Sequence, residues 1–378
     1  MRHRSRAIVA IVGLLLVACV GPTTKPVEVD PALAAREAEK QREIAFREGL
    51  RQQGRLWGIA YRLESAAAAL CGDHLRPTIG VTMLSALDVA KDFQPTARRV
   101  LGDGDGLFVT SVGDGSPAAE AGLRVGDRIV AIGGRTIPDT GGVSQAAGKI
   151  LDETAKADAP LAIGVRRAGA DLTVTARPVN ACDYAVRLSD GEEVNAYADG
   201  ETVIVTRGMM RFAQSDSDLA TIVAHEIAHD AMGHIDAQKT NAVAGAGVGL
   251  IFDIIAAVAG VNTQGGFSRL GSQSAARAFS QEFEAEADYV GLYIMARAGM
   301  DVEQAPNLWR RMAAAFPDAI ATNVNATHPS TPQRFVALEK TVAEIAEKRR
   351  VGAPLLPEIK APEIKSSAPA ITTDSDTK

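Results

Sequence analysis

The stretch LATIVAHEIAHDAM, residues 219–232, decides the fold and the chemistry of the C-terminal half of this chain. Its apolar residues recur at helical spacing, which predicts a helix. His225 and His229 are then about 40° apart around the helix axis, so both imidazoles face the same way and can bind one zinc ion. Glu226 stands beside them, where a carboxylate can accept a proton from zinc-activated water as that water attacks a carbonyl. The stretch therefore indicates metal-assisted hydrolysis.

A tetrahedral zinc site with one open position needs a third protein ligand. His234 follows the pair, but it does not fit the metzincin spacing. On a continuous helix it would point about 180° away from His225, so we interpret it as structural. A second predicted helix, residues 279–298, carries Glu284 and Asp288 one turn apart on one face. One carboxylate can bind the metal while the other accepts the free N–H of a zinc-bound histidine.

The residues around these motifs resemble a known family. From about Val194 to Leu338 the chain is similar to the bacterial HtpX-like and BepA-like zinc metallopeptidases, which are gluzincins related to the CAAX prenyl endoprotease. In that family a Glu-x-x-Ala-Asp motif follows His-Glu-x-x-His. The resemblance assigns Glu284 to the metal, rather than Glu282 or Glu286. It also implies one Zn²⁺ per chain and endopeptidase activity with Glu226 as the general base.

The same resemblance implies how substrate and transition state are held. The segment Asn195-Ala196-Tyr197 is similar to the family's edge strand, along which an extended substrate would bind as an added strand. His328 and Arg334 are similar to its His-Pro…Arg segment. Either side chain can stabilise the oxyanion, or the histidine can cap the zinc as an inhibitory ligand. The alternative is a His-Pro turn that only caps the final helix.

Residues 78–178 consist of short apolar runs broken by glycine, which predicts a β-rich module. Three segments, Gly106–Val112, Gly115–Leu123 and Val125–Gly134, resemble the PDZ domains of bacterial HtrA-like proteases. The resemblance implies that a glycine turn receives a peptide carboxylate and that an exposed strand edge adds the peptide as an extra strand. We assign this peptide-binding role to Gly106, Leu107, Phe108 and Val109. The alternative is a PDZ module that merely packs against its neighbour.

Cys71 and Cys182 flank this module, and PDZ domains bring their two ends close together. In an oxidising periplasm the two thiols are well placed to form a disulfide across the neck of the module. Two unpaired buried thiols are the alternative.

The N-terminus has the composition of an export signal. Three arginines precede a twelve-residue apolar run, Ala7–Ala18, which is too short to span a bilayer. The end of the run resembles the bacterial lipobox, so we expect cleavage after residue 18 and lipidation of Cys19. Val20 replaces the aspartate that retains such proteins at the inner membrane, which favours an anchor at the periplasmic face of the outer membrane. An ordinary signal peptide with an incidental cysteine is the alternative.

Residues 242–262 are almost wholly apolar and have about the length of a membrane span. A single span would place Glu284 across the membrane from His225, where one zinc ion could not bind both. We therefore interpret the segment as a glycine-rich helix that covers the active-site cleft or packs in the core. A hairpin that touches the membrane is the alternative.

Composition narrows the remaining classes. The 378 residues are 46% hydrophobic and 23% charged, as in soluble globular proteins, and the net charge of −6 offers no basic excess for nucleic acid. We predict an α+β chain, with a mostly helical zinc metallopeptidase domain that has a small edge-strand sheet and is preceded by a β-rich PDZ domain. Its predicted parts are a signal peptide (1–18), a tether (19–30), an N-terminal helix (31–72), the PDZ domain (76–180), the metallopeptidase domain (183–349) and a disordered tail (350–378).

The resemblances together imply a zinc-dependent endopeptidase of the cell envelope. Misfolded or unassembled envelope proteins would be its substrates, and the PDZ domain would hold the C-termini of substrates or adaptors. The rival hypothesis is a PDZ-bearing periplasmic chaperone or assembly factor whose zinc site is capped or structural. An intact motif does not decide between them, because it says nothing about access to the site.

Overall fold

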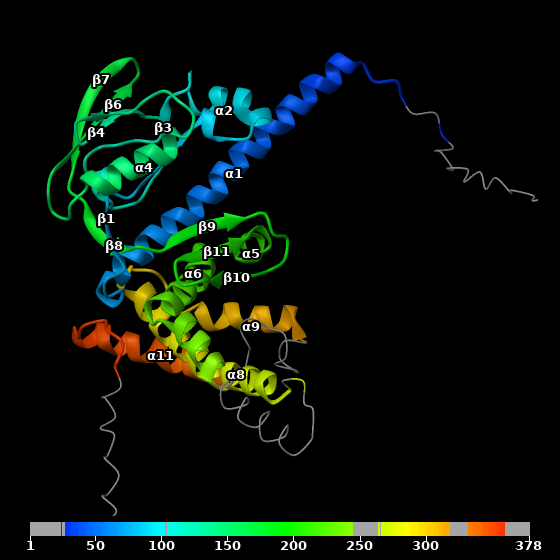
Figure 1. The fold of residues 1–378 in the computed structure, drawn as a ribbon, viewed down its shortest axis with the longest axis vertical. Helices are drawn as coiled ribbons and strands as arrows, with labels where there is room; N and C mark the ends of the chain where they lie inside the picture. Colours follow the sequence, from blue (N-terminus) through cyan, green and yellow to red (C-terminus); the bar gives the residue numbers. More distant parts are fainter. Residues whose placement is uncertain are drawn as a thin grey trace, which may run out of the picture.

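The computed structural model describes residues 24, 27–102, 104–244, 264, 266–317 and 332–359, with the backbone alone for residues 266–280. The predicted signal peptide, Cys19 and His328 lie outside these described residues, and so does the predicted apolar segment 242–262 except for its first three residues. Figure 1 shows a β-rich module and a mostly helical module with one long helix, α1, running past both. Within the described residues, none of the helices combines the length and apolar content needed to cross a bilayer.

Helix α1 spans Pro31–Ala67 and is followed by a short 3₁₀ turn, Ala68–Leu70. The Asp30 side chain accepts a hydrogen bond from the Ala32 N–H, and Pro31 occupies the first turn, where its missing N–H costs nothing. The first half of the helix is mostly exposed. The second half buries one apolar face, which includes Leu56, Ile59, Leu63 and Ala67, in the core of the helical module.

The β-rich module has a six-stranded sheet in the order β2-β3-β4-β6-β7, with the short β5 paired to β4. All pairings in this sheet are antiparallel. Its strands are β2 (Val81–Ser85), β3 (Leu107–Val112), β4 (Arg128–Ile132), β5 (Arg135–Thr136), β6 (Leu161–Arg167) and β7 (Ala170–Ala176). Its helices are α2 (Gln94–Leu101), α3 (Pro117–Glu120) and α4 (Val143–Thr154), with 3₁₀ turns at Ala86–Asp88 and Lys91–Phe93.

The predicted open edge at residues 107–112 is wrong, because β3 is an internal strand. It pairs with β2 along its length and with β4 at Leu107 and Phe108. The Val109 N–H donates to the Asp127 carbonyl on the same side. A side chain at Gly106 would collide with Arg128. Among the described residues, β2 is an edge strand of this sheet, and it lies next to α4.

The two ends of the β-rich module meet in a narrow neck. Strand β1 (Leu75–Thr78) pairs antiparallel with β8 (Val179–Cys182), with Leu75 opposite Cys182. A disulfide joins Cys71 to Cys182, whose Cα atoms are 5.7 Å apart. Both cysteines are buried. The two cysteines are 111 positions apart in the sequence, so the disulfide closes a loop that contains the whole β-rich module.

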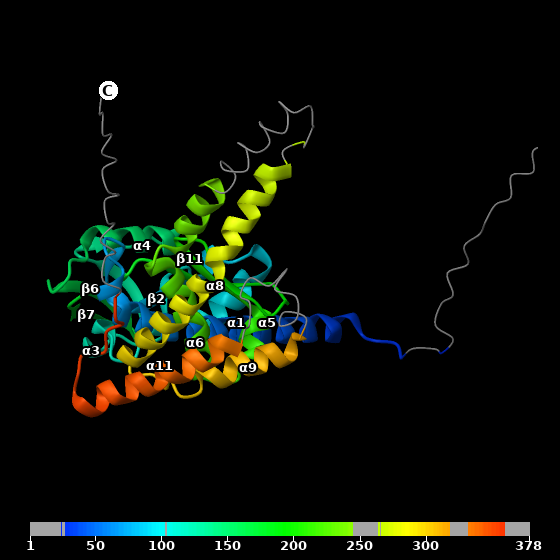
Figure 2. The same ribbon diagram turned by 90° about the horizontal axis from the view of Figure 1, so that it is seen from below.

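The helical module is built on a small sheet in the order β10-β11-β9, in which β10 is an edge strand. Its elements are β9 (Ala185–Ser189), β10 (Ala196–Ala198), β11 (Thr202–Thr206), α5 (Arg207–Phe212), α6 (Asp216–Ala231), α8 (Gly266–Arg297), α9 (Ala305–Ala315) and α11 (Pro332–Val351). Residues 234–244 are also helical. Helix α8 packs against both α6 and α11, and the view in Figure 2 shows α8 crossing the module.

The predicted disordered tail begins too early. Helix α11 continues to Val351, and Leu355 beyond it packs against the core of the helical module. Lys348 donates to the Leu356 carbonyl, and the Glu358 N–H donates to the Tyr289 hydroxyl. Residues 350–359 are therefore part of the folded structure, while residues 360–378 lie outside the described residues.

The disulfide predicts a redox-dependent stability. On the chain-entropy model, closing a loop of this length stabilises the folded chain by about 4–5 kcal/mol. We expect the melting temperature of the oxidised protein to fall clearly when dithiothreitol is added, as measured by circular dichroism. A Cys71→Ser/Cys182→Ser variant should melt at the temperature of the reduced wild type, and dithiothreitol should not change that temperature. Equal melting of the wild type with and without reductant would contradict this prediction.

Candidate metal centre

Helix α6 carries the His-Glu-x-x-His motif and begins at a well-defined cap. The Ser215 side chain accepts from the Asp218 N–H, while Asp218 accepts from the Ser215 N–H, which makes a reciprocal capping box. The cap of α6 is therefore Ser215. Arg311 of α9 pairs with Asp218 at 2.6 Å, so the start of α6 is also tied to a neighbouring helix.

Three side chains from α6 and α8 converge on one point. The Nε2 atoms of His225 and His229 are 3.2 Å apart. Each lies 3.3 Å from a carboxylate oxygen of Glu284. The edges of a tetrahedron around zinc with bonds of about 2.0–2.1 Å measure about 3.3–3.4 Å, so this donor set fits a zinc ion. Among the described residues it is the only group of three such donors.

Asp288 supports the first of these ligands. Its Oδ1 lies 3.0 Å from the Nδ1 of His225, so the nitrogen that does not face the centre has a carboxylate beside it. Burial alone would lower the pKa of the His225 imidazole, but Asp288 and Glu284 outweigh it and raise that pKa to about 10. Burial lowers the pKa of His229, and its contact with Glu284 does not reverse that shift.

Arg334 contacts both carboxylates of the centre, Asp288 and Glu284. Its Nε and Nη2 each donate to an oxygen of Asp288 at 2.8 Å, and its Nη1 lies 3.1 Å from Glu284. Its guanidinium also stacks over the ring of Trp309 at 5.0 Å. The side chain is buried and its fork is engaged by both carboxylates. These contacts favour a positioning role for Arg334 over the catalytic role expected from the sequence.

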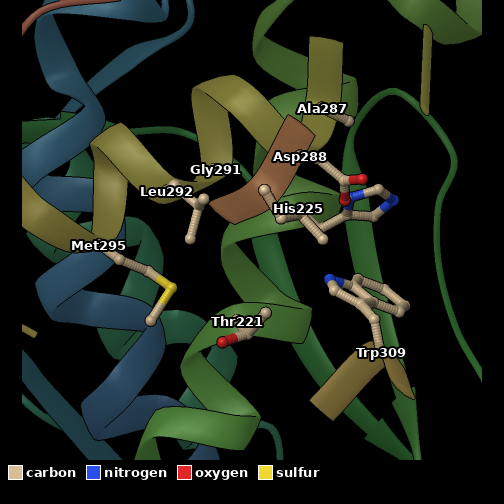
Figure 3. A pocket seen from close by; sticks show the side chains of 9 residues that line it. Thr221, His225, Ala287, Asp288, Gly291, Leu292, Met295 and Trp309 are labelled. Carbon is tan, nitrogen blue, oxygen red and sulfur yellow. The ribbon is translucent and has the colours of Figure 1, made fainter. Parts of the chain in front are cut away.

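Figure 3 shows the small pocket behind these residues, with the Asp288 carboxylate beside the His225 ring and Trp309 facing that ring from the other side. The two rings are 5.1 Å apart in an edge-on arrangement. Apolar side chains of α8, Leu292 and Met295, line the rest of the pocket. The ring of His225 is thus held between Asp288 and Trp309, which restricts its orientation.

The structure also locates the other ionisable residues that the sequence analysis considered for this centre. Glu226 is buried on α6 directly after His225. Glu282 is exposed on α8, and Glu286 contacts His234 instead of the centre. His234, interpreted as structural, lies against His229. The sequence reasoning missed this because α6 ends at Ala231, and Gly233 with φ +67° turns the chain.

The edge strand β10 is tied to the end of the metal-binding helix. The Gly200 N–H, in the turn after β10, donates to Asp230 at 2.9 Å, next to His229. Burial, with help from nearby Glu226 and Asp199, raises the pKa of Asp230 to about 7 although that N–H bond opposes the shift. Of the predicted substrate residues, Ala196 and Tyr197 therefore lie on a strand anchored beside the metal centre, and Asn195 directly precedes that strand. Tyr197 is exposed on that strand.

Comparisons with known proteins agree with this arrangement. Residues 165–342 match the model of Peptidase family M48, and residues 108–156 match that of the PDZ domain. The mixed helix-and-strand fold and the order of the two matches, a PDZ domain followed by an M48 peptidase domain, agree with the prediction. Strands β6 and β7 complete the PDZ sheet, so the PDZ module extends past residue 156.

Two curated relatives are proteases by name, and one of them is named as a metalloendopeptidase. The chain is 34% identical over 155 residues to the mitochondrial metalloendopeptidase OMA1 of Schizosaccharomyces pombe, which covers 40% of this chain and 44% of the relative. It is 30% identical over 135 residues to the beta-barrel assembly-enhancing protease of Escherichia coli O157:H7, covering 33% and 27%. The chain thus spans less than half the length of either relative. A solved HtrA3 PDZ domain with a phage-derived ligand is 24% identical over 28% of this chain and 88% of that one, with a TM-score of 0.21.

The raised pKa of His225 predicts that zinc binding releases a proton. Below pH 10 the metal-free protein holds that proton, whereas His229 is already neutral at pH 7. We expect about one proton released per zinc at pH 7, and zinc affinity that rises about tenfold per pH unit between pH 7 and 9. Calorimetry in buffers of different ionisation enthalpy measures this release. Binding without proton release would contradict the assigned charge of His225.

Proposed function

We propose that this chain is a zinc-dependent metalloendopeptidase of the bacterial cell envelope. The observation that carries the proposal is the convergence of His225, His229 and Glu284, whose donor atoms lie close enough to share one metal ion, with Glu226 buried on the same helix as the histidines. The family match and the two protease relatives support it. Because those relatives are covered only in part, the substrates are inferred from this chain's own surfaces.

The chemistry follows from the placement of the side chains. Zinc, when bound, would polarise a peptide carbonyl and lower the pKa of a water molecule. Glu226 would accept the proton of that water and pass it to the leaving amine. Asp288 and Arg334 would hold His225 and Glu284 in their orientations, since their hydrogen bonds and ion pairs fix both side chains.

An extended substrate would bind along β10. The Thr206 N–H donates to the Asn195 carbonyl, and the Asp199 N–H donates to the Thr202 carbonyl, so alternate residues of β10 face β11. By the two-residue period of a strand, the backbone groups of Ala196 and Ala198 face the open edge. Backbone pairing there would tolerate many sequences, with Tyr197 and Asn195 flanking the added strand.

The PDZ module would hold a C-terminus in the groove between β2 and α4. The Ser85 N–H donates to the Ser144 hydroxyl of α4, so that residue's N–H points away from β3. Met83, two residues earlier on the same side of the β-bulge, has its N–H on the same edge. This edge replaces residues 106–109 as the proposed peptide-binding strand.

The envelope assignment combines the sequence and one relative. The apolar N-terminal run and Cys19 support export and a lipid anchor, and the Escherichia coli relative is named for the assembly of β-barrels. We propose that the chain is lipid-anchored at the periplasmic face of the outer membrane. Misfolded or unassembled envelope proteins are the substrates that this position and the sequence-tolerant edge of β10 favour.

Replacing the general base tests the proposal directly. We expect Glu226→Gln to keep zinc, since the side chain is not among the three donors, and to lose nearly all cleavage of an unfolded protein such as casein. The cleavage rate of the variant should be at least about a hundredfold below that of the wild type, measured by peptide release with and without chelator. Full activity in this variant would sink the mechanism.

The same digest separates the rival hypothesis. Cleavage that appears only in His328→Ala, and not in the wild type, would mean a capped protease. If neither protein cleaves casein, with or without chelator, the result would favour the chaperone or assembly factor with a structural metal. The zinc content of both proteins should be measured in parallel, because a protein that has lost its zinc would also fail to cleave.

The β2 edge makes a separate prediction. Proline is tolerated in an edge strand where the lost N–H faces outward, so Met83→Pro should keep the fold and remove one donor to the peptide. We expect the affinity for C-terminal peptides to fall about tenfold or more by fluorescence anisotropy, while casein cleavage persists. Unchanged binding, with the fold intact by circular dichroism, would place the peptide elsewhere.

A further inference from the structure

His234 is a buried histidine whose two ring nitrogens both have partners. It is 1% exposed, and its Nδ1 lies 3.1 Å from the Nδ1 of His229. Its Nε2 lies 3.2 Å from Oε2 of Glu286 on α8. Its ring also stacks on Phe283, with centroids 4.6 Å apart. The side chain is therefore held between a candidate metal ligand and a second helix.

The direction of these hydrogen bonds follows from the geometry. The Nε2 of His229 faces His225 and Glu284 at 3.2 and 3.3 Å, so this nitrogen is the one that can bind zinc. Its Nδ1 must then carry the hydrogen and donate it to Nδ1 of His234. His234 in turn carries its hydrogen on Nε2 and donates it to Glu286. Each hydrogen bond in this series has one donor and one acceptor, so the assigned tautomers of the two histidines are mutually consistent.

His234 is placed to support a ligand and not to be one. Its Nδ1 faces the nitrogen of His229 that points away from the centre, and it is absent from the group of donors that converge there. The two candidate histidine ligands are thus supported differently. Asp288 stands beside the Nδ1 of His225, and a neutral imidazole stands beside that of His229.

We propose that His234 is a positioning residue for the metal centre, which fixes the tautomer and ring orientation of His229 and is itself held by Glu286. The proposal rests on the metalloenzyme function proposed above. Outer partners of zinc-bound histidines typically account for 10- to 100-fold in metal affinity. Glu286 is 53% exposed at its side chain, so its contribution should be the smaller of the two.

The test is the zinc dissociation constant, measured by competition with a chromophoric chelator at one fixed pH. His234→Phe keeps the ring stack on Phe283 but removes the acceptor, and we expect it to weaken zinc binding 10- to 100-fold. His234→Asn offers an amide oxygen near the position of Nδ1, and should recover most of the lost affinity. Glu286→Ala should weaken binding by less than His234→Phe. Glu282→Ala, which removes an exposed carboxylate one turn earlier on α8, is the matched control and should bind like the wild type.

The outcomes separate this proposal from its foundation. Wild-type affinity in a folded His234→Phe variant would overturn the positioning role. If that variant melts early without metal, equal affinity losses in His234→Phe and His234→Asn would overturn it as well, because a packing role does not depend on the acceptor. Failure of the wild-type chain to bind zinc would instead overturn the metal centre itself. The visible spectrum of the Co²⁺-loaded protein gives a second readout, since a reoriented His229 should change it.

Discussion

The close packing of α6 against α8 is the constraint on which the metal centre depends. A Cβ added at Gly291 of α8 would lie 3.1 Å from the backbone nitrogen of His225, so the two helix backbones nearly touch there. At that distance Glu284 and Asp288, two and one turns earlier on α8, reach the histidines of α6. A wider spacing would leave Glu284 short of both imidazoles, because each contact is already 3.3 Å.

The same packing gathers several ionisable groups in a buried place, and their charges must be balanced. Glu226, Glu284 and Asp288 are all nearly inaccessible to solvent. An isolated buried carboxylate is costly, so each must have a compensating neighbour. Arg334 reaches in from α11 and pairs with two of them, and together with His225 it holds the pKa of Asp288 below its usual range although burial opposes this. Helix α11 is therefore part of the centre and not only a cover for it.

Helical spacing predicted which side chains come together at the centre, and long-range contacts explain what it missed. The i, i+4 histidines and the carboxylates on a second helix needed only helical periodicity to be found. The role of His234 depended on where α6 stops, and the sequence reasoning assumed a continuous helix past Gly233. The open edge of the PDZ sheet was predicted on the wrong strand for a similar reason. A glycine turn followed by an apolar strand does not reveal which strands lie on either side of it. In the structure β3 has a neighbouring strand on each side, β2 and β4.

Helix α1 gives the PDZ module a fixed place relative to the metal centre. Tyr61 packs its ring against Gly80 and Gly113, where any Cβ would lie within 2.7 Å of a ring atom. Two residues later Leu63 is fully buried in the core that also contains α6, and Arg55 pairs with Asp216 at the start of α6. Both modules thus contact the same stretch of one continuous helix, and the disulfide at the neck adds a second connection. Since Gly80 immediately precedes β2, a peptide held on that edge would lie at a defined distance from α6 instead of on a flexible tether.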